Sequence, residues 1–313
     1  MTLPQRRIGD LTVSAIGLGC MPLSTEPMLA HRDRAIAVVH AALDAGITLF
    51  DTSNIYAPSW DTVGHNEELL AEALLAYTGP ADLSAVLVTT KGGITRSAGE
   101  QWGRDASPAG LRAACEASIE RLGGRPIALY QFHRHDPSMT YADQMRSLKA
   151  VLDAGLVQRV GLSNATLPEL ELALDIIGGP TDGGIVSVQN EFSPRYRADA
   201  DVLERSTELG IAFLPWSPLG GAEQAHEVGS RYGAFAEVGA RIGASAQEVV
   251  LAWLRQLSPV MIPIPGATRV ETVASIVRSA GVVLTPEDQA VLTATTPEAT
   301  SMYPEDAPRS PLQ

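Results

Sequence analysis

Four polar residues stand where three apolar segments of the chain end. Asp51 and Tyr56 lie in ITLFDTSNIY, Lys91 lies in AVLVTTKGG, and His133 lies in IALYQFHRHD. If the three segments are neighbouring parallel strands, their carboxyl ends meet at one rim and the four side chains converge there. The residue types and their common offset therefore predict one polar site.

These side chains suit the reduction of a carbonyl by hydride from a dihydronicotinamide. Negative charge develops on the carbonyl oxygen, and an acid must supply a proton there. Tyrosine has a pKa of about 10, which a neighbouring lysine ammonium lowers. An aspartate keeps that ammonium charged and fixed in direction, and a histidine can donate a hydrogen bond that orients the carbonyl. This chemistry makes Tyr56 the expected acid.

Each of the four residues also has a purely structural interpretation. Asp51 could cap the turn after its strand, and Tyr56 could be a loop aromatic that covers the mouth of a barrel. Lys91 could be a solvated strand end, and His133 could be a buried, hydrogen-bonded imidazole. Convergence of all four on one rim favours a shared site over four independent coincidences.

A metal-dependent hydrolase is an alternative, because His133-Arg134-His135-Asp136 places two histidines one residue apart. Such sites need further ligands on later strands. The later strands end in Ser163-Asn164, Gln189-Asn190 and Trp216-Ser217, which include no strong ligand. We therefore expect no metal.

Short apolar segments alternate with amphipathic helical patterns along the chain. We expect strands at 15–19, 47–51, 85–90, 127–132, 157–162, 185–189, 211–216 and 260–264. We expect helices at 32–46, 67–77, 108–124, 142–157, 168–179, 201–210, 246–257 and 270–281. Eight strand–helix units predict an α/β fold of the (β/α)8 TIM-barrel type, forming one domain over residues 1–313.

A doubly wound sheet is the competing fold. A dinucleotide site there would usually have Gly-x-Gly-x-x-Gly, and the segment 17–22 has no third glycine. Residues 5–19 predict an N-terminal hairpin and the first strand, and residues 297–313 an irregular tail. The connections 21–30, 92–106 and 217–244 are long and follow strands, so they would lie on the face where barrel enzymes build their sites.

Composition limits the possible partners. The chain has 313 residues and a net charge of −13, which argues against nucleic acid or an anionic membrane. No apolar run reaches the roughly 20 residues of a membrane-spanning helix. Cys20 and Cys115 form no disulfide framework, and polar residues interrupt the stretch after Arg6-Arg7, so we expect no export signal. We expect a soluble, cytoplasmic protein whose partner is a small molecule, with its oligomeric state open.

Eight motifs in matching order and spacing make nearly the whole chain resemble the aldo-keto reductase superfamily. They are LGCM (18–21), LFDTSNIY (49–56), VTTKGG (88–93), LYQFHRHD (129–136), GLSN (161–164), VQNEFSP (188–194), PWSPLGG (215–221) and IPIPGATR (262–269). The resemblance implies a TIM barrel with its N-terminal hairpin across the bottom, and a nicotinamide cofactor held without a Rossmann domain. It implies a carbonyl reductase, or an alcohol or aldose dehydrogenase, whose catalytic tetrad is Asp51, Tyr56, Lys91 and His133, with Tyr56 as proton donor.

The resemblance also implies how the nicotinamide would be held. Ser163, Asn164 and Gln189 would bind its carboxamide, and Trp216 would stack on its ring. Trp216 could equally plug the barrel, and the Ser163-Asn164 pair could cap a helix. The remaining cofactor candidates near the strand ends are Gly19, Cys20, Met21 and Asp51.

At the other end of the cofactor, the resemblance implies that Ser217, Pro218, Leu219 and Gly220 wrap the pyrophosphate. Pro265, Gly266, Ala267, Thr268 and Arg269 precede a helix whose N-terminus can receive an anion. Arg269 would meet a 2′-phosphate, which favours NADP(H) over NAD(H), although it could also be a solvated side chain. Ser275 is a further candidate, where Ser275-Ile276 departs from the Glu-Asn pair that many relatives carry near the adenine.

The substrate would lie over the exposed nicotinamide face, against Tyr56 and His133. Trp60 and Trp102 are the expected lining from the long loops, although both could simply pack those loops. A second hypothesis is a regulatory subunit that binds the cofactor with little turnover; the retention of Tyr56 together with Lys91 argues against it. The sequence specifies neither the substrate nor the physiological direction.

Overall fold

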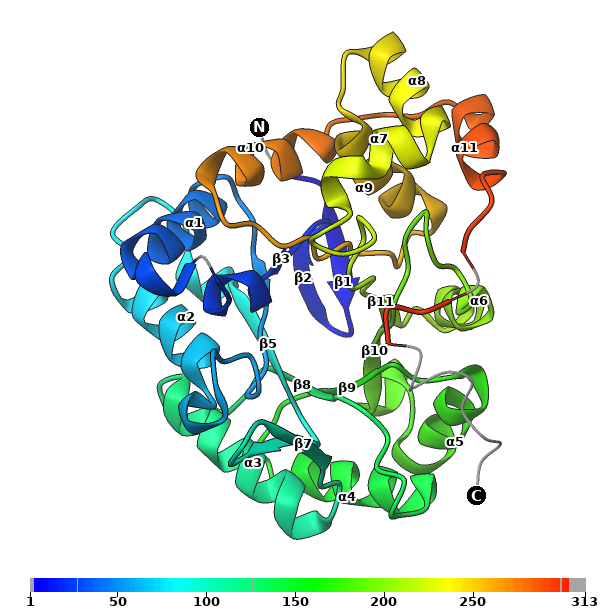
Figure 1. Cartoon of the computed structure of the whole chain (residues 1–313). Coiled ribbons are helices and arrows are strands. Elements are labelled where there is room, and N and C mark those ends of the chain that lie inside the picture. The colour runs from blue at the N-terminus through cyan, green and yellow to red at the C-terminus, as the bar shows by residue number, and fades with distance from the viewer. Residues whose placement is uncertain (1–2, 27, 125, 299, 304–313) are drawn as a thin grey trace.

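The computed structural model describes residues 3–26, 28–124, 126–298 and 300–303, and a curled parallel sheet forms its centre (Figure 1). Seven strands of the described chain pair in the order β11-β10-β9-β8-β5-β4-β3, each parallel to its neighbour. They are β3 (Leu18–Gly19), β4 (Leu49–Asp51), β5 (Leu87–Gly92), β8 (Leu129–Phe132), β9 (Val160–Ser163), β10 (Ile185–Gln189) and β11 (Ala212–Phe213). The parallel arrangement brings the carboxyl ends of all seven to one face.

Helices surround this sheet on its outer side (Figure 1). The eight regions expected to be helical overlap α1 (Arg32–Asp44), α2 (His65–Leu75), α3 (Pro108–Arg121), α4 (Tyr141–Asp153), α5 (Leu167–Ile177), α6 (Ala200–Leu209), α9 (Ala246–Leu257) and α10 (Val270–Ser279). Four begin at a Ser or Thr whose side chain accepts a hydrogen bond from the backbone N–H three residues later: Ser107, Thr140, Thr166 and Ser245. None of the helices described is long and apolar enough to cross a bilayer.

An inner apolar cluster takes side chains from strand after strand: Leu49, Leu87, Leu129, Val186, Ala212, Leu214, Ile262 and Ile264, together with Ile8 and Val13. Side chains alternate along a strand, and Phe50 belongs to the cluster shared with α1, so Leu49 faces the opposite, inner side of the sheet. Ile8 and Val13 lie in β1 (Gln5–Ile8) and β2 (Leu11–Ser14), which pair antiparallel. The N-terminal pair therefore contributes to the interior of the sheet.

The turn between β1 and β2 lies close to the amino end of β10. Gly9 has a φ of +59°, and a Cβ at this position would lie 2.8 Å from Val186 Cγ1. Asp10 in the same turn forms an ion pair with Arg159, which precedes β9. These contacts place the turn at the end of the sheet opposite the strand ends that carry the predicted site.

The prediction of a regular eighth strand at 260–264 is wrong. In this described segment, single bridges join Met261 to Phe213 and Gly266 to Gly19. The Ile262 N–H donates to the Phe213 carbonyl oxygen and the Gly17 N–H to that of Pro263, both at 2.9 Å. Pro263 and Pro265 have no N–H to donate, so a continuous ladder cannot form. The segment nevertheless hydrogen-bonds to both edge regions of the sheet.

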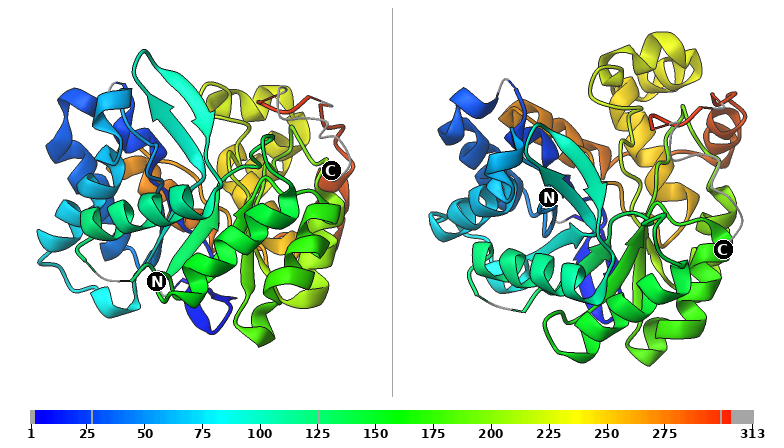
Figure 2. Two further views of the ribbon diagram at one scale, coloured as in Figure 1. Left: turned by 90° about the horizontal axis from the view of Figure 1, so that it is seen from below. Right: turned by 60° about the horizontal axis from the view of Figure 1, so that its bottom comes forward.

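The long connections contain elements that the sequence pattern did not reveal. Residues 92–106 include a hairpin of β6 (Ile94–Ser97) and β7 (Gln101–Arg104), which projects from the body of the molecule (Figure 2). Most of its side chains are exposed or half-buried, so it lacks the apolar alternation that marks a strand. The other two long connections contain η1 (Met21–Ser24), η2 (Met28–Ala30), η6 (Ala225–Glu227), α7 (Val228–Arg231) and α8 (Gly233–Ile242). Four further elements lie outside these connections: η3 (Trp60–Thr62), η4 (Leu83–Ala85), η5 (Pro180–Asp182) and α11 (Pro286–Thr293). Of the expected tail at 297–313, residues 299 and 304–313 lie outside the described residues.

Replacement of Ile8 by alanine tests whether the N-terminal pair of strands supports the inner cluster. Ile8 is completely buried, so we expect the Ile8→Ala variant to lose about 2–4 kcal/mol of unfolding free energy in urea titrations. Thr12 on the adjacent strand is exposed, so Thr12→Ala serves as control and should change that free energy by about 0.5 kcal/mol or less. Equal stability of the two variants would contradict the packing described above.

Candidate active site

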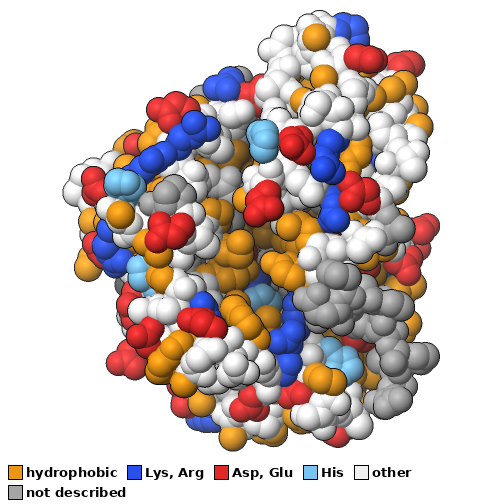
Figure 3. All heavy atoms as spheres, viewed as in Figure 1, with side chains coloured by type: hydrophobic (Ala, Val, Ile, Leu, Met, Phe, Trp, Pro, Cys, Tyr) orange, Lys and Arg blue, Asp and Glu red, His pale blue; other side chains and the backbone are white. Residues whose placement is uncertain are grey.

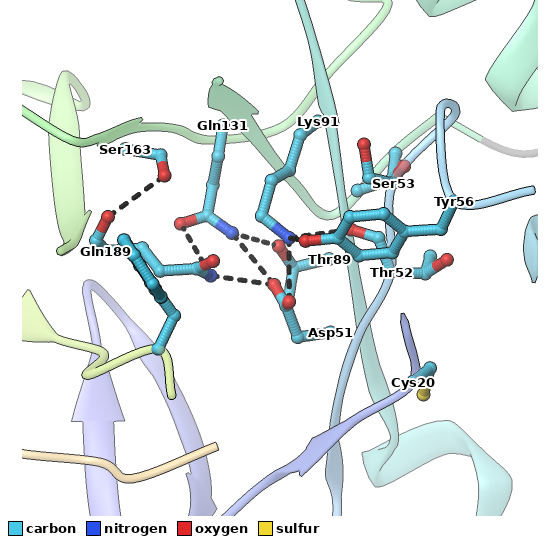
Figure 4. A network of polar contacts seen from close by, with 12 residues as sticks. Cys20, Asp51, Thr52, Ser53, Tyr56, Thr89, Lys91, Gln131, Ser163 and Gln189 are labelled. Atoms are coloured by element: carbon cyan, nitrogen blue, oxygen red, sulfur yellow. Dashed lines mark hydrogen bonds and ion pairs between the residues drawn. The ribbon is translucent and has the colours of Figure 1, made fainter. Parts of the chain in front are cut away.

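The structure brings Asp51, Lys91 and Tyr56 into direct contact (Figure 4). The Lys91 ammonium donates to Asp51 Oδ2 at 2.7 Å, to the Thr52 carbonyl oxygen at 2.9 Å and to the Tyr56 hydroxyl at 3.2 Å. An ammonium has three N–H donors, so these contacts use all of them. Nζ also lies 4.9 Å from the centre of the Tyr56 ring. Asp51 ends β4 and Lys91 lies in the adjacent β5, which explains their proximity.

The loop that carries Tyr56 is fixed by the start of α2. The backbone N–H of Asn66 donates to the Tyr56 carbonyl oxygen at 3.1 Å. The buried Asn66 side chain accepts from Thr52 Oγ1 at 2.6 Å and donates to the Cys20 carbonyl oxygen at 2.8 Å. One amide thus joins the turns after β3 and β4, which keeps the phenol at Lys91.

The protonation states follow from burial and charge. Burial raises the pKa of Tyr56 above its ordinary value, and the Lys91 ammonium opposes this without overcoming it. Burial lowers the pKa of Lys91, but the Asp51 carboxylate and Tyr56 outweigh that effect, so the pKa of Lys91 is raised overall. Lys91 lowers the pKa of Tyr56, as expected from the sequence, but the net shift of that pKa is upward because burial has the larger effect. At neutral pH the site therefore holds an ammonium and a protonated phenol.

His133 lies beside this group as a neutral imidazole. Its ring and that of Tyr56 meet edge to face with centroids 6.1 Å apart, and its Nδ1 lies 3.3 Å from Ser53 Oγ. Burial lowers the pKa of His133 well below its usual range, and the nearby cations Lys91, Arg134 and Arg104 lower it further. A neutral imidazole carries one N–H, so His133 can donate one hydrogen bond.

Gln131 also belongs to this site, and the sequence analysis did not identify it. Its Nε2 donates to Asp51 Oδ1 at 3.2 Å and to Thr89 Oγ1 at 2.7 Å, and its side chain is completely buried. Gln189, expected at the cofactor, donates from Nε2 to the same Asp51 oxygen at 2.8 Å. The position of Gln131 two residues before His133, on the same side of an otherwise apolar strand, was the available signal.

Four residues predicted to hold the nicotinamide lie together at the ends of β9 to β11. The Ser163 hydroxyl donates to the Gln189 carbonyl oxygen at 2.9 Å, and Asn164 Nδ2 donates to Ser163 Oγ at 3.0 Å. Trp216 Nε1 donates to Asn164 Oδ1 at 3.0 Å. Asn164 and Ser217 have φ values of 56° and 47°, a left-handed conformation that non-glycine residues rarely adopt and that occurs preferentially at functional sites.

The two segments predicted to hold the phosphates differ in their surroundings. In the first, the Gly220 N–H donates to the Ser217 carbonyl oxygen at 2.8 Å, which closes a tight turn in which Pro218 is buried and Leu219 is half-buried. In the second, Gly266 bridges to Gly19 beside Pro265 and the buried Ala267. Arg269 is the exposed N-cap residue of α10, and the Thr268 carbonyl oxygen accepts from Arg34 Nε at 2.9 Å. Of the neighbouring candidates, Cys20 is buried and Met21 is exposed.

Three other candidates make their contacts elsewhere. The Ser275 hydroxyl donates to Glu248 of α9 at 2.9 Å. Trp102 lies on the projecting hairpin with Arg96 over its ring, and the backbone N–H of Trp60 donates to the Glu100 carboxylate in the turn of that hairpin. Both tryptophan side chains are exposed. Trp60 therefore contacts the hairpin that carries Trp102. These contacts do not test the predicted role of the two side chains at the substrate.

Tyr303, which the sequence analysis did not identify, lies at the predicted nicotinamide end of the site. Its ring centre is 5.7 Å from that of Trp216, and the Arg134 guanidinium lies 5.2 Å from the centre of the Tyr303 ring. Glu191 holds the preceding residues, because it accepts from Ser301 Oγ at 2.7 Å and from the Met302 N–H at 3.1 Å. No local sequence pattern could place this distant segment against Trp216.

The face of the molecule seen in Figure 1 is hollowed near its middle (Figure 3). Apolar side chains form much of the visible lining, with charged side chains around the edge. An apolar hollow with a few convergent polar groups is the usual form of a small-molecule site. The arrangement can bind a small molecule, donate a proton from a phenol and stabilise the resulting negative charge with an ammonium.

Comparisons with known proteins agree with this geometry. The model of the Aldo/keto reductase family matches residues 15–296. An uncharacterised oxidoreductase of Schizosaccharomyces pombe is 32% identical over 291 residues, which are 90% of this chain and 86% of that protein. An aldo/keto reductase from Klebsiella pneumoniae, solved with NADP and acetate, superposes with a TM-score of 0.77 at 22% identity, covering 95% of this chain and 97% of the other. The glycerol dehydrogenase of Gluconobacter oxydans superposes with a TM-score of 0.75 at 21% identity over 95% and 98%. The family match and the curated relative together establish that this chain belongs to the aldo/keto reductase family.

Proposed function

We propose that this protein is an NADP(H)-dependent oxidoreductase that reduces an aldehyde or ketone to an alcohol, or catalyses the reverse reaction. The observation that carries the proposal is the contact of the buried Lys91 ammonium with both Asp51 and the Tyr56 hydroxyl. Family membership supports the reaction class. Neither the regulatory subunit nor the metal-dependent hydrolase receives support from the comparisons.

The residues at the strand ends fit a nicotinamide cofactor. Ser163, Asn164 and Gln189 offer amide and hydroxyl groups that suit a carboxamide, beside the flat Trp216 indole. The tight turn at Ser217–Gly220 suits a pyrophosphate, and the N-terminus of α10 with the exposed Arg269 suits a 2′-phosphate. The Klebsiella pneumoniae relative was solved with NADP, which supports this choice of cofactor. When bound, the dihydronicotinamide would supply a hydride to the carbonyl carbon.

The side chains of this protein would perform the remaining chemistry. Tyr56 would donate its hydroxyl proton to the carbonyl oxygen as negative charge develops there. Lys91 would stabilise the tyrosinate that results, and Asp51 would keep the ammonium in place. His133, as a neutral donor, would orient the carbonyl oxygen toward Tyr56. Trp216, with Tyr303 against it, would cover one face of the nicotinamide ring and leave the other face to the substrate.

The architecture we propose for this activity is one closed barrel domain. Residues 260–266 would close the sheet, because they hydrogen-bond near Phe213 on one side and near Gly19 on the other. The β1–β2 pair would cover the bottom, since Ile8 and Val13 join the inner cluster. Cys20 and Cys115 are buried free thiols, which is consistent with a reducing compartment such as the cytoplasm.

Tyr56→Phe tests the proposed proton donor, with wild type first assayed against aldehydes, ketones, sugars and alcohols using NADPH and NADH in both directions. The substitution removes only the hydroxyl, so we expect kcat to fall by at least about a hundredfold while cofactor affinity, measured by fluorescence quenching, stays nearly constant. Tyr77→Phe is a matched control, because Tyr77 pairs with Asp44 away from the site. A Tyr56→Phe enzyme with wild-type turnover would remove Tyr56 from the mechanism.

Arg269→Ala tests the proposed preference for NADP(H). Loss of a guanidinium at a phosphate should raise the Kd for NADPH about tenfold and change that for NADH by about twofold or less. Arg278 lies at the other end of the same helix and pairs with Glu248, so Arg278→Ala serves as control. Equal weakening of both cofactors in the Arg269 variant would refute the assignment of Arg269 to the 2′-phosphate.

A further inference from the structure

A buried glutamine, Gln131, lies beside the ion pair of Lys91 and Asp51. Gln131 is the register partner of Lys91 across β5 and β8, and its side chain has no solvent exposure. A buried amide is costly unless its donors and acceptors are paired. Gln131 Nε2 donates to Oδ1 of Asp51, the carboxylate that pairs with Lys91, and to Thr89 Oγ1 (Figure 4).

Charge determines which way this amide points. Ionised Asp51 only accepts hydrogen bonds, so a reversed amide would set its oxygen against a carboxylate oxygen. Gln189 Nε2 donates to the same Oδ1 at 2.8 Å and lies 3.4 Å from Gln131 Oε1. Two amide donors therefore converge on Asp51 Oδ1, and the second contact of Gln131, with Thr89, holds its amide in this orientation.

The paired amides restrain the other oxygen of Asp51. Oδ2 is one of the three acceptors of the Lys91 ammonium, and rotation of the carboxylate about its Cβ–Cγ bond would carry Oδ2 away from Nζ. Because the remaining two donors are committed to Thr52 and Tyr56, a moved carboxylate would displace the ammonium as well. The contact with Tyr56, at 3.2 Å, is the longest of the three and the one that the reaction uses.

We propose that Gln131 is a positioning residue for the reaction: acting through Asp51, it keeps the Lys91 ammonium on the Tyr56 hydroxyl. The proposal rests on the function proposed above, since it concerns the same proton donor. Gln131 makes its side-chain contacts with Asp51, Thr89 and Gln189, so its effect is transmitted rather than direct. Gln189 shares the carboxylate but would also meet the cofactor, which makes Gln131 the residue that isolates the effect.

Gln131→Met tests this role, because methionine has a similar length and no amide. We expect kcat for NADPH-dependent reduction to fall about tenfold to a hundredfold while the Kd for NADPH changes by about threefold or less. The alkaline limb of the kcat–pH profile should also move to higher pH. A poorly placed Lys91 lowers the pKa of Tyr56 less, and reduction requires the protonated phenol. A variant that only lost stability would keep the alkaline limb of its kcat–pH profile at the wild-type pH.

Gln144→Met is the matched control. Gln144 is also completely buried, and its Nε2 donates to the carbonyl oxygens of Asp136 and Met139. Its substitution should lower the melting temperature and leave the alkaline limb unchanged. A folded Gln131→Met enzyme with wild-type kcat and a wild-type limb would overturn the proposal.

If Gln131→Met does not fold, Thr89→Val decides the question, because it removes the hydroxyl that holds the Gln131 amide. We expect a smaller loss of kcat in this variant and a limb shifted in the same direction. A wild-type rate and limb would overturn the proposal equally. Failure of the wild-type protein to turn over any aldehyde, ketone, sugar or alcohol of the panel in either direction would instead refute the proposed function, so the two failures are distinguishable.

Discussion

The Lys91 ammonium is withdrawn completely from water, so each of its N–H groups must find an acceptor within the protein. Asp51 supplies a counter-charge, Thr52 turns its carbonyl oxygen inward, and Tyr56 offers its hydroxyl. The end of β4, the loop after it and the carboxyl end of β5 must therefore keep their positions for this ammonium to remain hydrogen-bonded. A phenol held against such an ammonium can give up its proton to a substrate and leave a stabilised anion.

The parallel sheet provides the positions that this cation needs. Along a strand every second side chain faces the same side, which places an apolar residue deepest and the polar residues nearer the carboxyl end. The series are Leu49 and Asp51 in β4, Leu87, Thr89 and Lys91 in β5, and Leu129, Gln131 and His133 along and after β8. The inner apolar cluster therefore supports a layer of amides and hydroxyls, and that layer supports the reacting groups. Substitutions in either layer would therefore displace the reacting side chains even where the substituted residue does not contact the substrate.

Most of the elements, and the contact of Asp51 and Tyr56 with Lys91, could be predicted because they depend on local patterns and family motifs. Residues 260–264 form no regular strand because Pro263 and Pro265 lack backbone N–H donors. The prediction followed the apolar pattern of this segment and gave these prolines too little weight. The role proposed for Gln131 needed the register of β5 against β8, and the contact of Tyr303 with Trp216 needed the path of a distant segment. The net upward shift of the Tyr56 pKa could not be predicted, because it depends on how deeply the phenol is buried and no motif specifies that. Long-range geometry and desolvation were thus the missing information.

The central claim, that the Lys91 ammonium controls the Tyr56 proton, is tested most directly by titration of that phenol. Protein labelled with 13C at tyrosine Cζ would report its ionisation by NMR, with Tyr56→Phe identifying the resonance. Without cofactor, Tyr56 should titrate above the ordinary tyrosine pKa of about 10, because burial outweighs the ammonium. Lys91→Met should raise that pKa further, since it removes the charge that favours tyrosinate. A Tyr56 pKa that is unchanged or lower in Lys91→Met would contradict the account.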